Sequence, residues 1–323
     1  MEKKQEIKFD FGWGNPYFLL ELLNALYWPD LSTPDIKKMS YAPDEGNPEL
    51  IKQTKKIIKD ITGQSYDHIL ITNGATHAIN TILRYYKRQG YEEVLTREYG
   101  YPFYADMIKR AGLDRVIVSE IDTFLPKEKQ FALIDSPSNP KGLQTGMGSD
   151  ENTVWDSVYH NKIYTDDLDT IPPHYWHIGS YSKLLGLTGA RVGWIATNNA
   201  FAHALITDEC LKDNATISVP SQDLIIDIIK RVDLDRFLNH GKRSLNNNRE
   251  TIQKIEYLFD GQPVQSSGMF YCANADKKTI ELLNNCGIQY VNLGDNYIRL
   301  SLGQTGKITK EAIEALLKKD KIK

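Results

Sequence analysis

The chain has 323 residues, a length that suits one large domain together with a smaller one. Its formal net charge of -3 gives no electrostatic reason to expect nucleic acid as a main partner. Its three cysteines lack the spacing of a metal or redox motif, so no metal is expected. The N-terminus has no apolar signal core, and no apolar stretch approaches the roughly 20 residues that cross a bilayer. We therefore expect a cytoplasmic protein that does not associate with a membrane.

Between about residue 68 and residue 200, short apolar stretches alternate with stretches of helical periodicity. In chain order, the sequence predicts a strand at His68–Thr72, a helix at Ala75–Gln89, a strand at Glu93–Thr96, a helix at Pro102–Ala111, and further strands at Arg115–Ser119, Phe131–Asp135, Lys162–Thr165, Trp176–Gly179 and Val192–Ala196. Strands separated by connections of helix length favour a mostly parallel sheet that is covered on both faces. The sequence thus predicts an α/β fold for this region.

The pattern changes after about residue 235. A charged helical stretch is expected at Asp235–Phe259, followed by short strands at Met269–Ala273 and Tyr297–Leu302 and an amphipathic helix at Lys310–Leu317. We therefore divide the chain into an N-terminal segment, 1–40, a large domain, 41–235, and a small α+β domain, 236–323. The N-terminal segment is expected to contribute to the small domain and to the substrate site.

The strongest chemical signal is SYSKLLGLTGARVGW, which runs from Ser180 to Trp194. Lys183 follows a predicted strand and stands among hydroxyl and small residues, where a desolvated amine becomes a nucleophile. Ser180 and Ser182 offer hydroxyl groups to a phosphate, and Arg191 offers a planar fork of donors suited to the same group. A single lysine is most often a surface residue in a polar loop, but the cluster as a whole argues for a site.

SxSK followed by GxRxGW resembles the lysine segment of fold-type I, class I and II aminotransferases, the aspartate aminotransferase-like family. The resemblance implies the transferase fold of enzymes that use pyridoxal 5'-phosphate. In that fold a large domain holds a mostly parallel, seven-stranded type of sheet between helices, beside a smaller α+β domain. It also implies that Lys183 carries the cofactor as a Schiff base and that the large domain binds it.

The other motifs of the family can be sought in chain order. ITNGATHAI, Ile71 to Ile79, places a glycine turn between a strand and a helix, where backbone N–H groups favour an anion. The resemblance assigns Gly74, Ala75 and Thr76 to the cofactor phosphate. REYGYPFY, Arg97 to Tyr104, resembles PxYPxY and implies that Tyr101 stacks on the pyridine ring as part of the catalytic site. Each motif taken alone has an ordinary structural explanation, as a strand–helix loop or a core aromatic.

DSPSNPKG, Asp135 to Gly142, is similar to SPxNPxG and implies that Asn139 contacts both the phenolic oxygen of the cofactor and the substrate. IYTDDLD, Ile163 to Asp169, resembles the strand end whose aspartate keeps the pyridine nitrogen protonated. We assign this catalytic role to Asp166, with Asp167 as the alternative. Three residues further on, many members have a tyrosine, whereas this chain has Asp169.

Three more motifs concern the substrate and the neighbouring subunit. YAPDEGNPEL resembles YGPxEGxPEL, which implies that Tyr41 reaches across a homodimer interface to the phosphate of the partner's cofactor. DFGWGNP resembles LGxGxP and implies that Trp13 and Gly14 line the amino-acid pocket. YIRLSLG fits the arginine strand of the small domain, so that Arg299 would bind the substrate carboxylate through two hydrogen bonds.

The resemblance implies an aminotransferase that moves an amino group from an L-amino acid to a 2-oxo acid by a ping-pong mechanism. A lyase or decarboxylase of the same fold is the main alternative, and Asp169 in place of tyrosine is the feature that supports it. A cofactor-binding protein without activity would need a damaged lysine or arginine motif, and both are intact. A dinucleotide-binding dehydrogenase is disfavoured because no GxGxxG follows a strand. The scattered histidines disfavour a metal enzyme.

Overall fold

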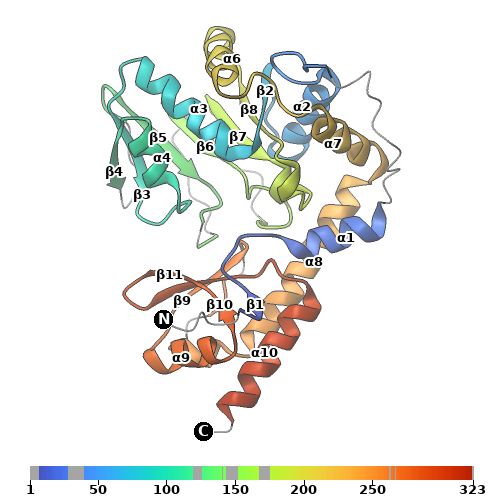
Figure 1. The fold of residues 1–323 in the computed structure, drawn as a ribbon, viewed down its shortest axis with the longest axis vertical. Helices are drawn as coiled ribbons and strands as arrows, with labels where there is room; N and C mark the ends of the chain where they lie inside the picture. The colour runs from blue at the N-terminus through green and yellow to red at the C-terminus, as the bar shows by residue number, and fades with distance from the viewer. Residues whose placement is uncertain are drawn as a thin grey trace.

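The computed structural model describes residues 7–27, 40–118, 126–139, 141–142, 152–166, 175–261, 263–265 and 267–321. Its largest element is a seven-stranded sheet in the upper half of Figure 1. In spatial order the strands are β2 (His68–Thr72), β8 (Gly193–Thr197), β7 (Trp176–Ser180), β6 (Thr153–Asp156), β5 (Gln130–Asp135), β3 (Glu93–Arg97) and β4 (Asp114–Val118). Strand β8 runs antiparallel to both neighbours, and the other pairs are parallel. The predicted α/β fold with a mostly parallel sheet is confirmed.

Helices cover both faces of this sheet. The first group is α3 (Gly74–Arg88), α4 (Tyr104–Arg110) and α6 (Ala200–Asn214), and the second is α2 (Pro48–Thr62), α5 (Tyr181–Leu184) and α7 (Val219–Arg231). Alternate residues of a strand point to opposite faces. In β2, accordingly, Leu70 packs with the first group while Ile69 and Ile71 pack with the second. Both faces of the sheet are thus buried, as the continuous apolar strands of the sequence require.

Local sequence signals explain where helix α2 begins and ends. The side chain of Asn47 accepts a hydrogen bond from the backbone N–H of Glu49 (2.9 Å), and Pro48 occupies the first helical position, where it has no N–H to leave unpaired. Gly63 ends the helix with a φ of 70°, a conformation that glycine adopts without steric cost.

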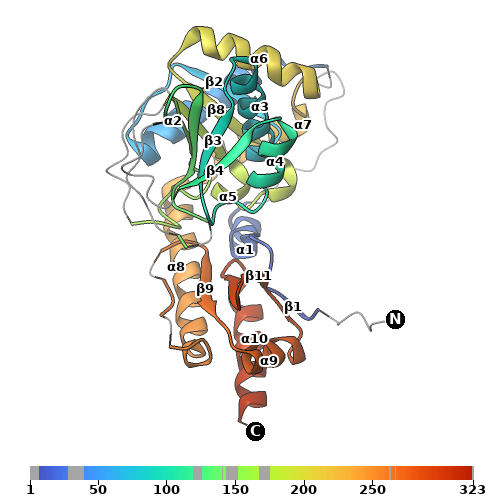
Figure 2. The same cartoon turned by 90° about the vertical axis from the view of Figure 1, so that its left-hand side faces the viewer.

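The rest of the chain forms a smaller α+β part, in the lower half of Figure 1. It contains the antiparallel sheet β11–β12–β9 and the parallel pair β1–β10. Its elements are β1 (Phe9–Asp10), α1 (Tyr17–Leu26), α8 (Leu234–Gln253), a 3₁₀ turn at Glu256–Leu258, β9 (Phe270–Asn274), α9 (Lys277–Asn285), β10 (Ile288–Gln289), β11 (Val291–Gly294), β12 (Tyr297–Ser301) and α10 (Gly306–Asp320). Helix α8 packs against α1 and α10 and extends from the large sheet layer into the small part (Figure 2). The predicted boundary at 235 falls in the first turn of α8, and the division into domains stays a prediction.

One predicted strand is wrong. The stretch Lys162–Thr165 forms turns, and the strand of the large sheet that the sequence did not reveal is β6, nine residues earlier. The carbonyl and side chain of Asn161 explain the turns, because they accept hydrogen bonds from the N–H groups of Tyr164 (3.0 Å) and Ile163 (2.9 Å). The other predicted strands of the large sheet agree with the structure within two residues. None of the helices in the described ranges combines the length and apolarity that crossing a bilayer requires.

Candidate active site

A cavity of about 540 Å³ lies at the carboxyl ends of β5, β6 and β7, where the N-terminus of α3 meets residues of the small part. Open α/β sheets bind their ligands at this edge. The predicted site residues that line the cavity are Trp13, Gly14, Ala75, Thr76, Tyr101, Asn139, Ser180, Ser182, Lys183, Arg191 and Arg299. Motifs spread over almost the whole chain are therefore brought to one place.

Lys183 projects into this cavity from α5, directly after β7. Its amine donates a hydrogen bond to the carbonyl oxygen of Gly14 (2.5 Å), across the cavity. Desolvation, together with the positive charges of Arg191 and Arg299, lowers the pKa of Lys183 to about 8. About a tenth of the amine is therefore neutral at pH 7, far more than for an ordinary lysine, and the neutral form is the one that a nucleophile or a general base requires.

The turn between β2 and α3 faces the same cavity. Gly74 has a φ of +75°, and a Cβ placed on it would lie 2.6 Å from Nη2 of Arg191. A glycine at position 74 is therefore what lets the guanidinium approach the backbone at the start of the helix. The N–H groups at a helix N-terminus together with a guanidinium form a binding site for an anion such as phosphate.

Two serine hydroxyls adjoin this turn and are used differently. Ser180 donates to the carbonyl oxygen of Val192 (3.2 Å) and accepts from the N–H of Ser182 (3.1 Å), so its hydroxyl is engaged within the protein. The hydroxyl of Ser182 is buried and has no hydrogen-bond partner among the described residues. Since buried hydroxyls are rarely left unpaired, Ser182 is the better candidate to donate to a bound phosphate.

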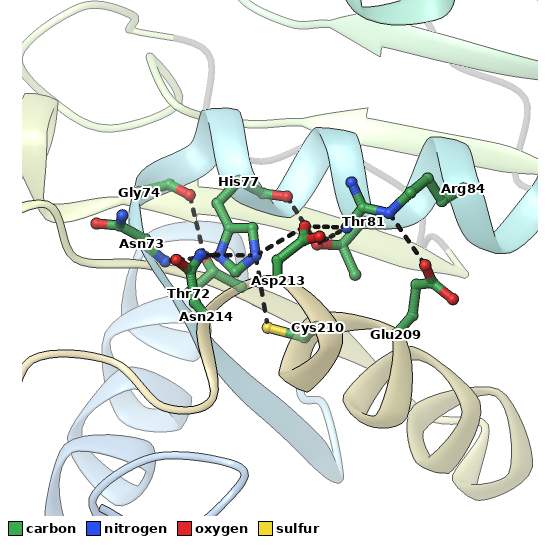
Figure 3. A network of polar contacts seen from close by, with 10 residues as sticks. All are labelled: Thr72, Asn73, Gly74, His77, Thr81, Arg84, Glu209, Cys210, Asp213 and Asn214. Atoms are coloured by element: carbon green, nitrogen blue, oxygen red, sulfur yellow. Dashed lines mark hydrogen bonds and ion pairs between the residues drawn. The ribbon is translucent and has the colours of Figure 1, made fainter. Parts of the chain in front are cut away.

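A polar network behind the turn supports it from helix α6 (Figure 3). Nδ1 of His77 accepts a hydrogen bond from the N–H of Asn73 (3.1 Å), so its proton resides on Nε2. Nε2 lies 3.6 Å from a carboxylate oxygen of Asp213, which is also bound by Arg84. Burial lowers the pKa of His77, so Nδ1 remains available as an acceptor at neutral pH. No motif in the sequence distinguishes this histidine.

Replacing His77 by leucine is expected to weaken the binding of inorganic phosphate about tenfold, because the buried N–H of Asn73 loses its acceptor and the turn loses its support. Isothermal titration of the purified protein with phosphate measures the change. His203→Leu is the matched control, since His203 is also a buried histidine that faces a carboxylate, that of Glu45. Equal phosphate affinity in both variants would contradict the supporting role of His77.

Asp166, to which the catalytic role was assigned, does not lie at the cavity, and the aspartates that line it are Asp135 and Asp156. The side chain of Asp166 is 76% exposed and pairs with Lys242 of α8, away from the cavity. Asp156 ends strand β6, lines the cavity and is 7% exposed. The error follows from the misplaced strand, because the motif was aligned with Lys162–Thr165 instead of β6. Asp167, the alternative, and Asp169 lie outside the described residues.

Tyr159 follows Asp156 by three residues and also lines the cavity. The resemblance implies a tyrosine three residues after the aspartate, and Tyr159 stands at that distance from Asp156. Three residues after Asp166 the chain has Asp169 instead. Burial raises the pKa of Tyr159 well above its usual range, so its hydroxyl remains a donor. Asp156 and Tyr159 were not predicted as site residues, although the segment DSVY, Asp156 to Tyr159, has an aspartate and a tyrosine three residues apart.

Arg299 enters the cavity from strand β12. It donates to Oδ1 of Asn139 (2.7 Å) and to the carbonyl oxygen of Gly12 (2.9 Å), and its guanidinium lies over the ring of Phe270 (4.3 Å). Its Nε is buried and has no partner among the described residues. Burial lowers the pKa of Arg299, but a guanidinium stays charged at neutral pH. The arrangement suits a carboxylate ligand.

Of the remaining predicted residues, Tyr101 and Trp13 lie at the cavity and Tyr41 does not. Tyr101 lines the cavity with its hydroxyl 3.4 Å from Oγ1 of Thr76. Trp13 lines it as well and is 57% exposed. Tyr41 does not line this cavity and is 84% exposed, so its contact with a neighbouring subunit stays a prediction.

The model of the family described as Aminotransferase class I and II matches residues 35–145 and 153–316. A (5-formylfuran-3-yl)methyl phosphate transaminase of Methanocaldococcus jannaschii is 24% identical over 311 residues, which cover 86% of this chain and 83% of that protein. A histidinol-phosphate aminotransferase of Pelagibacter ubique is 22% identical over 304 residues, with 83% and 81% covered.

Solved structures show the same fold. An aromatic aminotransferase from Pyrococcus horikoshii superposes with a TM-score of 0.75 at 18% identity, covering 98% of this chain and 97% of that one. A mutant aspartate aminotransferase of Thermus thermophilus, complexed with tryptophan, gives a TM-score of 0.75 at 17% identity, covering 98% and 92%. At these identities the likeness concerns the fold alone.

Proposed function

The chain belongs to the class I and II aminotransferase family, and from this premise we propose that it is an aminotransferase that uses pyridoxal 5'-phosphate. It would move an amino group from an L-amino acid to a 2-oxo acid in two half-reactions of a ping-pong mechanism. The observation that carries the proposal is the cavity itself, in which the Lys183 amine lies between an anion-binding turn and a buried arginine.

The residues fit the proposed cofactor at several points. The unpaired hydroxyl of Ser182, the close approach of Arg191 to Gly74, and the N–H groups of Ala75 and Thr76 would hold its phosphate. The remaining cofactor residues would be Tyr101 at the ring face, Asp156 at the pyridine nitrogen, and Asn139 and Tyr159 at the phenolic oxygen. Pyridoxal phosphate, when bound, supplies a conjugated ring that accepts the negative charge developing at the substrate's Cα.

The protein's own groups would bind the substrate and move its proton. Arg299 would hold the α-carboxylate with two parallel hydrogen bonds, which fixes the direction in which Cα faces. Lys183 would attach the cofactor covalently at rest, and its Nζ, once released, would accept the Cα proton of the amino acid. The lowered pKa of about 8 makes this proton transfer possible near neutral pH.

Several finer points belong to the same proposal. Trp13 and Gly14 would border the substrate side chain, and the apolar indole would favour an apolar or aromatic amino acid. The protein would act as a cytoplasmic homodimer in which Tyr41, exposed on this chain, reaches the partner's site. The lyase or decarboxylase alternative depended on Asp169 in place of tyrosine. With Tyr159 three residues after Asp156, no feature of the described residues favours that alternative.

Replacing Arg299 by glutamine is expected to raise KM for the amino acid about 10-fold to 100-fold, because charge-assisted hydrogen bonds to the carboxylate are lost. The change is measured from steady-state kinetics with an amino acid and with the corresponding amine that lacks the α-carboxylate. The amine serves as the internal control, since its binding does not involve Arg299. An equal rise in KM for both substrates would contradict the carboxylate-binding role.

The proposed function is tested by following the absorption spectrum of the purified protein with pyridoxal phosphate while single amino acids are added. A lasting shift to the spectrum of the aminated cofactor, reversed by a 2-oxo acid, is the expected result. Reduction with borohydride followed by peptide mass spectrometry gives a readout independent of turnover, in which the cofactor mass appears on the Lys183 peptide. A spectrum that returns unaided with release of ammonia or carbon dioxide would point to a lyase or decarboxylase instead.

A further inference from the structure

Two carboxyl groups, not one, lie at the sheet end of the cavity, and the family resemblance accounts for only one of them. We propose that Asp135 and Asp156 act as a carboxyl pair that binds a single proton, with Asp156 as the carboxylate and Asp135 as the acid. Asp135 would thereby be a positioning residue that limits the charge beside Asp156. The inference deepens the proposed function, because it concerns the charge presented to the cofactor ring, but its test does not require activity.

The backbone places the two carboxyls side by side. Asp135 ends β5 and Asp156 ends β6, and the two residues are register partners in neighbouring parallel strands. The backbones of adjacent strands lie about 5 Å apart, and the side chains of register partners point to the same face. Both side chains line the cavity and are almost fully buried, with exposures of 4% and 7%. The charge of Asp156 also raises the pKa of Asp135, and two neighbouring buried carboxyls do not both ionise without strong compensation.

Hydrogen-bond donors distinguish the two members of the pair. Asp156 accepts from the hydroxyl of Tyr104 (2.7 Å) and from the N–H of Val158 (3.2 Å), and both bonds favour its charged form. Asp135 accepts from the N–H of Asn139 (2.8 Å). Burial raises the pKa of Asp135 to about 7, assisted by the charge of Asp156, and burial raises that of Asp156 to about 6. The asymmetry assigns the proton to Asp135.

The other ionisable groups around the pair do not change this assignment. Arg97 of β3 lowers the pKa of Asp135, but less than burial raises it. The hydroxyls of Tyr104 from α4 and Tyr159 after β6 both have raised pKa values, so they stay neutral. Beside the fixed charge of Arg97, the charge near the pair therefore varies with how many protons the two carboxyls hold.

The pair is also linked to the carboxylate-binding end of the cavity. Asp135 accepts the N–H of Asn139, whose side-chain oxygen in turn accepts from Arg299 (2.7 Å). Asp135 therefore lies between the carboxylate proposed for the pyridine nitrogen and the arginine proposed for the substrate. The substitution Asp135→Asn would keep this hydrogen bond, because an amide oxygen also accepts, and would resemble the protonated acid without being able to ionise.

The test is the stability of the full-length chain as a function of pH, measured by thermal unfolding between pH 4 and pH 8. A carboxyl whose pKa is raised on folding stabilises the protein below its unfolded pKa of about 3.9, and this stabilisation is lost as pH rises through the folded value, about 7 for Asp135. Asp135→Asn is therefore expected to unfold at the same temperature as the wild type near pH 4 and several degrees higher at pH 8.

A double-mutant cycle with Asp156→Asn tests whether the proton is shared. Removing either carboxyl abolishes the same repulsion, so the gain of the double variant at pH 8 is expected to be smaller than the sum of the single gains. Asp276→Asn is the matched control, because Asp276 also accepts a backbone N–H, that of Thr279 (2.7 Å), but its pKa is lowered. That variant is expected to lose stability at pH 8, not to gain it.

Parallel stability curves for the wild type and Asp135→Asn, or additive single gains, would overturn the proposal. If Asp135→Asn does not fold, Asp156→Asn alone remains decisive. Without the charge of Asp156, the pKa of Asp135 in the folded protein is expected to be lower, so the loss of stability with rising pH is complete at a lower pH. A curve of stability against pH that does not move would refute the pairing. Because these measurements need neither substrate nor turnover, a negative result leaves the aminotransferase proposal untouched, and a failed spectral test leaves the carboxyl pair intact.

Discussion

Replacing Lys183 by alanine is expected to reduce turnover by at least about 10⁴-fold, since one amine would supply both the covalent attachment and the general base. The geometry gives the reason, because the described cavity lining holds no second lysine. Single-turnover mixing of the variant with pyridoxal phosphate and an amino acid measures the residual rate. Borohydride reduction of the same variant is expected to leave no cofactor on the 180–190 peptide.

Lys162→Ala is a suitable control, because Lys162 pairs with Asp235 at the surface and does not line the cavity. It is expected to retain wild-type activity and covalent cofactor. Turnover of Lys183→Ala at the rate of this control would refute the central assignment. If Lys183→Ala still binds the cofactor, but without covalent attachment, the result supports the assignment of Lys183. The proposed phosphate-binding turn at Gly74 does not depend on the lysine amine.

Replacing Asp156 by asparagine is expected to lower kcat/KM by about 10² to 10³-fold, since a fixed charge at the electron-accepting end of the site is removed while its shape is kept. The amide retains an oxygen for the hydroxyl of Tyr104, so the fold is expected to tolerate the change. Steady-state kinetics give the loss, and circular dichroism checks that the variant remains folded.

Asp166→Asn is the matched control for this prediction. The same chemical change at an exposed carboxylate, paired with Lys242 at the surface, is expected to leave kcat/KM within about a factor of two. If Asp166→Asn were the damaging substitution and Asp156→Asn the silent one, the structural correction of the aspartate would be wrong. The pair of variants therefore decides between the two positions directly.

Much of the fold could be predicted from the sequence because its strands are short, apolar and separated by turn residues. His68–Thr72 is apolar or β-branched after its first residue, and the structure buries those four residues; Trp176–Ser180 is fully buried and begins with a large aromatic residue. Strand β6 escaped prediction because Thr153–Asp156 has only four residues and no alternation that distinguishes it from a loop. The competing stretch Lys162–Thr165 has the composition of a strand, but the hydrogen bonds of Asn161 fold it into turns.

The site was predictable where a motif has several fixed residues. The segment from Ser180 to Trp194 placed Lys183 and Arg191 in the cavity, and the arginine strand did the same for Arg299. The aspartate was misplaced because a carboxylate at a strand end is identified only through the strand. Asp135 and His77 were not predicted as site residues, because their importance depends on neighbours in space, Asp156 and Asn73, that sequence spacing does not reveal.

The segment Gly12–Gly14, which follows β1, affects how substitutions can alter the substrate pocket. The carbonyl oxygens of Gly12 and Gly14 accept hydrogen bonds from the two cavity cations, Arg299 and Lys183, so these contacts come from the main chain and not from replaceable side chains. A Cβ at position 12 would lie 3.0 Å from Gln289, and one at position 14 would lie 3.1 Å from Phe270. Trp13, between them, lines the cavity with a side chain that is 57% exposed, so it can be replaced without crowding these neighbours. The shape of the pocket entrance can therefore be altered by a single residue while both cations keep their backbone partners.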